Sequence, residues 1–130
     1  MEAVSQQGLT SSHRVIGLDI HPDTFTAAIV DASTDELISS SSQIPMQRLK
    51  GWVSRHHVPG DLYVVEAGSN SFTTVEKIRS CGALAIVLES FRAGQIGKAY
   101  LKNDLIDAEK VARIYLSGLA HEVWIPDEQT

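Results

Sequence analysis

Two apolar runs, each with an acidic residue at or next to its last position, constrain the fold of this chain most strongly. Residues 14–20 read Arg-Val-Ile-Gly-Leu-Asp-Ile, and residues 62–66 read Leu-Tyr-Val-Val-Glu. A short apolar run without polar alternation is typical of a strand that is covered on both faces of a sheet. Packing within such strands does not explain the charges of Asp19 and Glu66. The runs therefore predict a buried sheet with a functional site at the ends of two strands.

The signals around these runs predict one α/β domain. We expect strands at 14–20, 25–30, 36–44, 62–66 and 83–88, and helices at about 45–57, from the turn at 68–71 to Cys81, and at about 103–117. The first three strands are close enough in sequence to form an antiparallel meander, and the serine-rich third strand is expected near an edge. The later strands are separated by helices, which implies parallel pairing with right-handed crossovers.

Each predicted helix has an apolar face. The residues assigned to these faces are Met46, Leu49, Trp52 and Val53 in the first helix, Phe72, Val75 and Ile78 in the second, and Leu105, Ala108, Ala112, Tyr115 and Leu119 in the third. Asn103 is a plausible N-cap of the third helix and Gly118 marks its end. We interpret Trp52 and Trp124 as core or interface anchors.

A second acidic pair, Asp104 and Asp107, lies at the start of the third predicted helix. Residues three apart on a helix project from one face. Mg²⁺ prefers oxygen ligands, and phosphodiester chemistry uses metal ions to hold the attacking and leaving oxygens. Together with Asp19 and Glu66, the pair predicts a site for Mg²⁺ or Mn²⁺ that carries out phosphoryl transfer.

Composition limits the class of protein. The chain has 130 residues, enough for one domain, and its net charge of −5 argues against a basic protein that coats DNA. It contains no apolar run long enough to span a membrane, and residues 1–13 are predicted to be a flexible tail without the features of a signal peptide. A single cysteine, Cys81, fits a cytoplasmic location.

Simpler explanations exist for several of these residues. Asp104 and Asp107 also suit the first turn of any helix, where acidic side chains are favourable, and Glu66 suits a strand end paired with a lysine. Arg92, Lys98 and Lys102 are candidate contacts to backbone phosphate, and a solvated loop explains them equally well.

Two further motifs give weaker signals. Ser69 follows a strand as a nucleophile does, but Ser71 stands where that motif requires glycine. His56 and His57 are adjacent, so on a helix they point in different directions, and a solvated helix end explains them better than a metal site.

Three segments of the chain resemble the DEDD insertion-sequence transposases, the family that includes the Piv-type DNA invertases. They are residues 15–20, Val-Ile-Gly-Leu-Asp-Ile; residues 64–69, Val-Val-Glu-Ala-Gly-Ser; and residues 102–112, Lys-Asn-Asp-Leu-Ile-Asp-Ala-Glu-Lys-Val-Ala. The resemblance covers roughly residues 14–126. The order βββαβαβα is also that of ribonuclease H-like domains, in which the first strand lies beside the fourth.

This resemblance implies a RuvC-like, ribonuclease H-like fold with a five-stranded mixed sheet. It implies that Asp19, Glu66, Asp104 and Asp107 form a catalytic metal-binding tetrad acting in DNA cleavage and strand transfer during transposition. It also implies DNA as a partner, guide RNA in target choice, and assembly of the full protein into dimers or tetramers. The chain departs from the family in the turn His21-Pro22-Asp23, where relatives commonly carry a basic residue.

Family members also have a C-terminal domain with a nucleophilic serine. We therefore expect residues 127–130 to begin a linker to such a domain, and this chain to be a truncated product or an excised domain that keeps the metal site without full recombination activity. A non-catalytic dimerisation or regulatory fragment is the alternative. An actin-like ATPase or sugar-kinase fragment is less favoured because His21-Pro22 replaces the glycine-rich turn that such proteins need after the aspartate.

Overall fold

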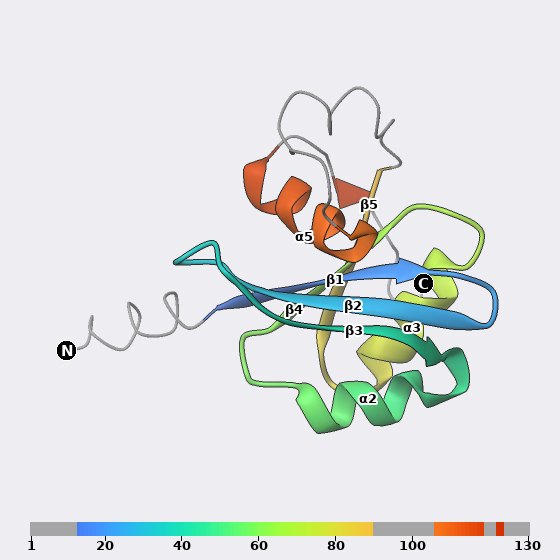
Figure 1. The fold of residues 1–130 in the computed structure, drawn as a ribbon. Helices are drawn as coiled ribbons and strands as arrows, with labels where there is room; N and C mark the ends of the chain where they lie inside the picture. The colour runs from blue at the N-terminus through green and yellow to red at the C-terminus, as the bar shows by residue number, and fades with distance from the viewer. Residues whose placement is uncertain (1–12, 90–105, 119–121, 124–130) are drawn as a thin grey trace.

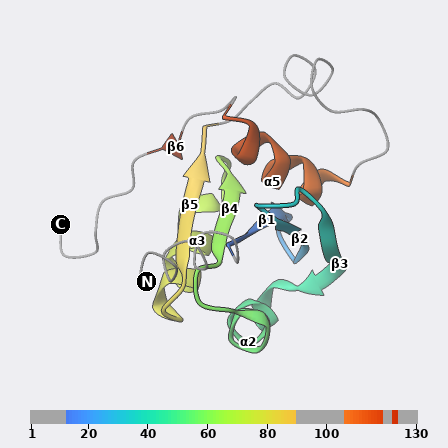
Figure 2. The ribbon, with the colours of Figure 1, turned by 90° about the vertical axis from the view of Figure 1, so that its left-hand side faces the viewer.

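The computed structural model describes residues 13–89, 106–118 and 122–123. These residues form an α/β fold in which helices cover both faces of one mixed sheet (Figures 1 and 2). The elements are β1 (Arg14–Ile20), β2 (Thr24–Asp31), β3 (Leu37–Pro45), the 3₁₀ turn η1 (Met46–Arg48), α2 (Leu49–His56), β4 (Leu62–Glu66), α3 (Ser71–Ser80), β5 (Leu84–Leu88), α5 (Asp107–Ser117) and β6 (Glu122–Val123).

The sheet has the strand order β3-β2-β1-β4-β5-β6. Strands β1, β2 and β3 pair antiparallel, which confirms the predicted meander, and the serine-rich β3 is an edge strand. Strand β4 lies parallel between β1 and β5, as the alternation of strands and helices predicts. The two-residue β6, which pairs antiparallel with β5, was not predicted.

The continuous apolar character of β1 and β4 follows from two separate cores. Ile16 and Leu18 of β1 pack on the side of α2 and α3, together with Tyr63 of β4. Val15 and Val64 point to the opposite side, where α5 covers the sheet. Figure 1 shows α5 on one side of the strands and α2 and α3 on the other. Both side-chain directions of these strands are therefore buried, as a sheet between two helical layers requires.

Gly17 allows α5 to lie directly on β1. A Cβ atom at this position would be 2.7 Å from the backbone nitrogen of Ala112 and would overlap the carbonyl oxygen of Ala108. Glycine inside a strand is expected where another segment of backbone approaches closely. Gly17 therefore fixes where the helix crosses the sheet.

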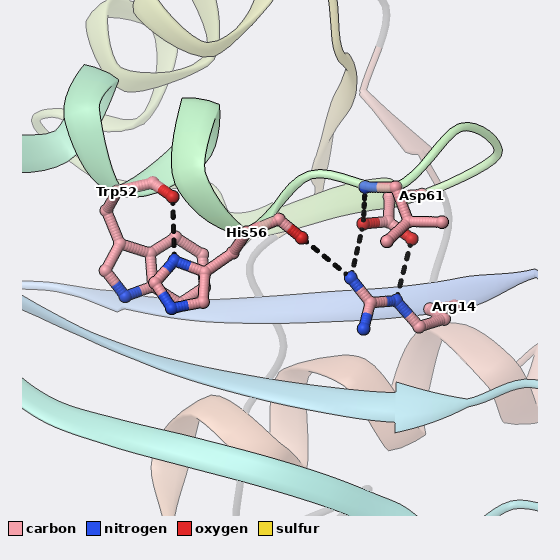
Figure 3. Close-up of polar contacts among 5 residues, drawn as sticks. Arg14, Trp52, His56 and Asp61 are labelled. Carbon is pink, nitrogen blue, oxygen red and sulfur yellow. Dashed lines mark hydrogen bonds and ion pairs between the residues drawn. The ribbon is translucent and has the colours of Figure 1, made fainter.

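A buried ion pair joins the start of β1 to the turn before β4 (Figure 3). Asp61 accepts hydrogen bonds from Nε and Nη2 of Arg14, at 2.9 and 2.8 Å, and from the backbone nitrogen of Val58 at 2.9 Å. Arg14 also donates to the carbonyl oxygen of His56 at 2.9 Å. The bond to Asp61 raises the pKa of Arg14. The pair holds the amino ends of these two strands together.

The structure corrects the predicted start of the third helix. Ile106 has an extended backbone, with φ −70° and ψ 155°, so α5 begins at Asp107 rather than at Asn103. The extended Ile106 therefore interrupts the single helix on which Asp104 and Asp107 were predicted to share one face. The predicted cap Asn103 lies outside the described residues.

Two other expectations about the helices are also wrong. Phe72 is 47% exposed, while Ser71 and Thr74 are buried on the inner face of α3. The histidines at the end of α2 are half-buried rather than fully solvated: His56, the last residue of α2, stacks on Trp52 with ring centroids 4.1 Å apart, and the rings of His57 and Tyr63 are 6.3 Å apart. Trp52 itself is buried in the core, as predicted, against Phe25.

Within the described part of the chain, no helix has both the length and the apolar character needed to cross a membrane.

Candidate functional site

Asp19 and Glu66 lie side by side at the carboxyl ends of two neighbouring inner strands, β1 and β4. In the parallel pairing of β1 with β4, Leu18 is opposite Val65, and the next residue in each strand is the acidic one. Side chains alternate along a strand, so Asp19 shares the face of Gly17, and Glu66 shares the face of Val64. Both carboxylates therefore lie on the α5 side, where the two strands end.

The two carboxylates line a single pocket of about 160 Å³. Its walls come from the end of β1 and the following turn, the end of β4 with the loop into α3, and one residue of α5: Leu18, Asp19, Ile20, Pro22, Glu66, Ala67, Gly68, Ser69, Asn70, Ser71 and Val111. The Asp19 side chain is 26% exposed, so it is open to a ligand without being fully solvated. The pocket has the size of a site for ions and a phosphate group rather than for a large cofactor.

The loop from β4 into α3 is held by its own hydrogen bonds. The hydroxyl of Ser71 accepts a bond from the backbone nitrogen of Gly68 at 3.1 Å and donates one to its carbonyl oxygen at 2.9 Å. This bonding explains why Ser71 is buried at the start of α3. The motif resembling a nucleophile therefore forms a helix-starting turn, which is the interpretation favoured by the sequence.

Helix α5 runs from the carboxyl ends of the strands toward their amino ends. Val111 lines the pocket with Asp19 and Glu66, whereas Tyr115 lies beside Leu62 and Leu84, which begin β4 and β5. The N-terminus of α5 therefore lies on the carboxylate side of the sheet. Its positive dipole end there favours negative charge.

Asp107 is the first residue of α5, and its side chain is 70% exposed. Its carboxylate lies 3.7 Å from Nζ of Lys110, an ion pair within the first turn. This contact fits the simpler explanation of Asp107 as a favourable charge at a helix start. Asp107 is on the same side of the sheet as the pocket but does not line it.

The other predicted site residues, Asp104, Arg92, Lys98 and Lys102, lie outside the described residues. Among the residues that the structure describes, no three His, Cys, Asp or Glu side chains are grouped closely enough to hold a metal ion. Asp19 and Glu66 fit a hard cation by their oxygen donors and their shared pocket, and they provide two of the four predicted ligands.

His21 is a contact of the site that the sequence did not reveal. Its Nε2 lies 3.0 Å from Oδ2 of Asp19. His21 follows Asp19 by two residues. Successive side chains of an extended chain point to opposite faces, so these two side chains point to the same face. Gly17 was also missed, although a glycine inside an apolar strand is a recognisable signal of close backbone approach.

A larger pocket of about 520 Å³ lies away from the carboxylates, near the amino ends of β4 and β5. Leu62, Leu84 and Tyr115 form part of its apolar wall, and Arg79 and Glu122 are its charged residues. The guanidinium of Arg79 is bonded to the carbonyl oxygen of Ala85, at 2.9 and 3.1 Å, so it is engaged with the backbone of β5. Asp19 and Glu66, the described members of the predicted acidic set that line a pocket, line the smaller one.

No protein-family model matches the sequence, and no curated protein matches it.

Proposed function

We propose that this chain is the metal-dependent catalytic domain of a DEDD-type transposase or recombinase, with a RuvC-like, ribonuclease H-like fold, which acts in DNA cleavage and strand transfer. One observation carries the proposal: Asp19 and Glu66 lie at the carboxyl ends of neighbouring parallel strands and line one pocket. The meander followed by parallel strands, with β1 beside β4, is compatible with that fold.

The roles of the residues follow from their positions. Asp19 and Glu66 would hold a cation from rigid strands, so their oxygens would move little on binding. Asp107 would approach from the start of α5, and Asp104 would complete the set from the preceding segment. When bound, Mg²⁺ or Mn²⁺ supplies charge stabilisation and orients the oxygens of a phosphodiester.

The partners belong to the proposal as well. DNA is the proposed substrate, guide RNA is proposed to direct target choice, and the active protein is proposed to be a dimer or tetramer. In the family that the chain resembles, strand transfer also uses a serine-bearing C-terminal domain, and the role proposed for this domain is to bind metal and contribute to the cleavage site. Arg92, Lys98 and Lys102 are proposed contacts to backbone phosphate.

Metal-dependent stabilisation tests the proposal directly. If the site binds Mg²⁺ or Mn²⁺ with a dissociation constant of about 1 mM, about 10 mM metal stabilises the fold by roughly 1.4 kcal/mol. For a domain of this size the melting temperature then rises by about 3–8 °C. Thermal unfolding is measured in metal and in chelator at equal ionic strength, for the native chain, Asp19→Asn and Glu66→Gln.

The control variant is Glu76→Gln, which neutralises an exposed carboxylate on α3 outside the pocket. It should keep the full metal response, while Asp19→Asn and Glu66→Gln should lose most of it. Identical melting curves of the native chain with and without saturating metal would exclude the metal site. A non-catalytic dimerisation or regulatory module would then be the better assignment.

A further inference from the structure

The turn after β1 places a hydrogen-bond donor on one of the two pocket carboxylates. Nε2 of His21 is 3.0 Å from Oδ2 of Asp19. A carboxylate oxygen only accepts hydrogen bonds, so the imidazole nitrogen is the donor in this contact. Val15, Ile16 and Leu18 of β1 are anchored in the cores, whereas Asp19 is partly exposed. Its carboxylate orientation therefore depends on neighbouring polar groups such as this one.

The backbone of the turn fixes where the imidazole lies. The backbone nitrogen of His21 donates to the carbonyl oxygen of Thr24 at 2.9 Å, which closes the connection between β1 and β2. Pro22 follows His21 and restricts its backbone to extended conformations. Pro22 also lines the pocket beside Asp19. The turn therefore forms one wall of the site and directs the imidazole at the carboxylate.

We infer that His21 is a positioning residue for Asp19: its ring N–H holds the carboxylate in the orientation that binds the cation. The inference rests on the proposed function, because it assumes that Asp19 is a metal ligand. A group that hydrogen-bonds a metal-ligating carboxylate restricts the rotation of that carboxylate. Less conformational freedom is then lost when the metal binds. Loss of such a group typically weakens metal affinity by about 10–100-fold. His21 is 56% exposed, so the lower end of that range applies.

The experiment measures Mn²⁺ affinity directly, by electron paramagnetic resonance of free Mn²⁺ at one mildly alkaline pH. Three variants separate the roles of the side chain. His21→Gln keeps an N–H donor at about the position of Nε2, His21→Asn places the donor too near the backbone, and His21→Ala removes it. We expect dissociation constants about tenfold higher for the Ala and Asn variants and close to the native value for the Gln variant.

A merely structural role of His21 would give a different result. Urea unfolding in chelator should show similar stability for all four proteins, because the ring contributes little to the core. If His21→Ala binds Mn²⁺ as tightly as the native chain, the positioning role is wrong although the metal site stands. If His21→Gln loses as much affinity as His21→Ala, the ring itself is required and positioning by an N–H donor is wrong. If the native chain binds no Mn²⁺, the proposed function fails, and this inference fails with it.

Discussion

At the scale of single residues, Gly17 determines whether α5 can cover the sheet. Replacing it with alanine would drive a methyl group into the carbonyl oxygen of Ala108 and against the backbone nitrogen of Ala112. Both are backbone atoms of the helix, so no side chain can move away to relieve the contact. We expect Gly17→Ala to lower the free energy of unfolding by about 2–3 kcal/mol, as overpacking in a core typically does. Urea unfolding measures the change.

Gly51 provides a matched control for this substitution. It lies in α2, and a Cβ atom built there meets nothing within 4 Å. Alanine is favoured over glycine inside a helix by about 0.5–1 kcal/mol, so Gly51→Ala should stabilise the domain. The two glycine-to-alanine changes therefore have opposite predicted signs. A Gly17→Ala protein as stable as the native chain would mean that α5 does not pack on β1 at this point.

At the scale of elements, the ion pair of Arg14 and Asp61 holds β1 to the turn that precedes β4. The Asp61 side chain is fully buried and accepts hydrogen bonds from Arg14 and from the backbone of Val58. Asp61→Ala leaves both donors without this acceptor. Breaking a buried pair costs about 3–5 kcal/mol, and the partial exposure of Arg14 reduces that penalty, so we expect a loss of about 2–4 kcal/mol.

Urea unfolding at neutral pH checks this value against Glu36→Ala, which removes an exposed carboxylate just before β3. The control should change stability by less than about 0.5 kcal/mol. An Asp61→Ala loss no larger than that of the control would contradict a structural role for the pair. A loss of stability in Asp61→Ala but not in Glu36→Ala would show that the ion pair stabilises the pairing of β1 with β4 at their amino ends. The adjacency of Asp19 and Glu66, at the opposite ends of these strands, depends on that pairing.

Strand positions could be predicted well because local chemistry marks both of their ends. The runs at 14–20 and 62–66 match β1 and β4 to the residue, since each is apolar and bounded by turn residues.

Helix faces were less predictable. The hydroxyls of Ser71 and Thr74 are satisfied by nearby carbonyl oxygens, at 2.9 and 2.8 Å. These small polar residues can therefore be buried while Phe72 remains exposed.

The start of α5 was mispredicted for a related reason. Asn103 is a good N-cap by local chemistry, but Ile106 is extended and the helix begins where Ala108 and Ala112 meet β1. Helices in proteins take most of their stability from tertiary packing, so a capping signal alone is a weak guide to such a boundary.

The site was predictable only in part, because its geometry depends on strand order. Asp19 and Glu66 are 47 positions apart in the sequence. No local pattern brings them together; the parallel pairing of β1 with β4 does. The contact of His21 with Asp19 was hidden because it depends on how the turn closes onto Thr24. Asp107, in contrast, was placed on the helix correctly, but its exposure and its pairing with Lys110 required the structure.

At the scale of the whole molecule, the negative net charge of the chain would repel DNA, the proposed substrate. The chain carries a net charge of −5, and two of its arginines, Arg14 and Arg113, are engaged in internal ion pairs. Arg113 links Glu109 of α5, at 2.8 Å, to Asp35 in the turn between β2 and β3, at 3.2 Å. These cations stabilise the fold instead of attracting phosphate. If the proposed function is right, close approach of DNA to the acidic pocket would require a divalent cation between the carboxylates and the phosphate.

This requirement predicts that DNA binding depends on divalent metal beyond any effect of ionic strength. Fluorescence anisotropy with a labelled branched DNA, at constant ionic strength, should show at least about tenfold tighter binding in Ca²⁺ or Mg²⁺ than in chelator, equivalent to about 1.4 kcal/mol. Affinity in metal should also fall steeply as monovalent salt increases, because phosphate contacts release counterions. The double variant Asp19→Asn, Glu66→Gln should abolish the difference between metal and chelator, since neutral amides neither repel phosphate nor bind the cation strongly. If native chain and double variant respond to metal alike, the pocket is not where DNA meets the domain.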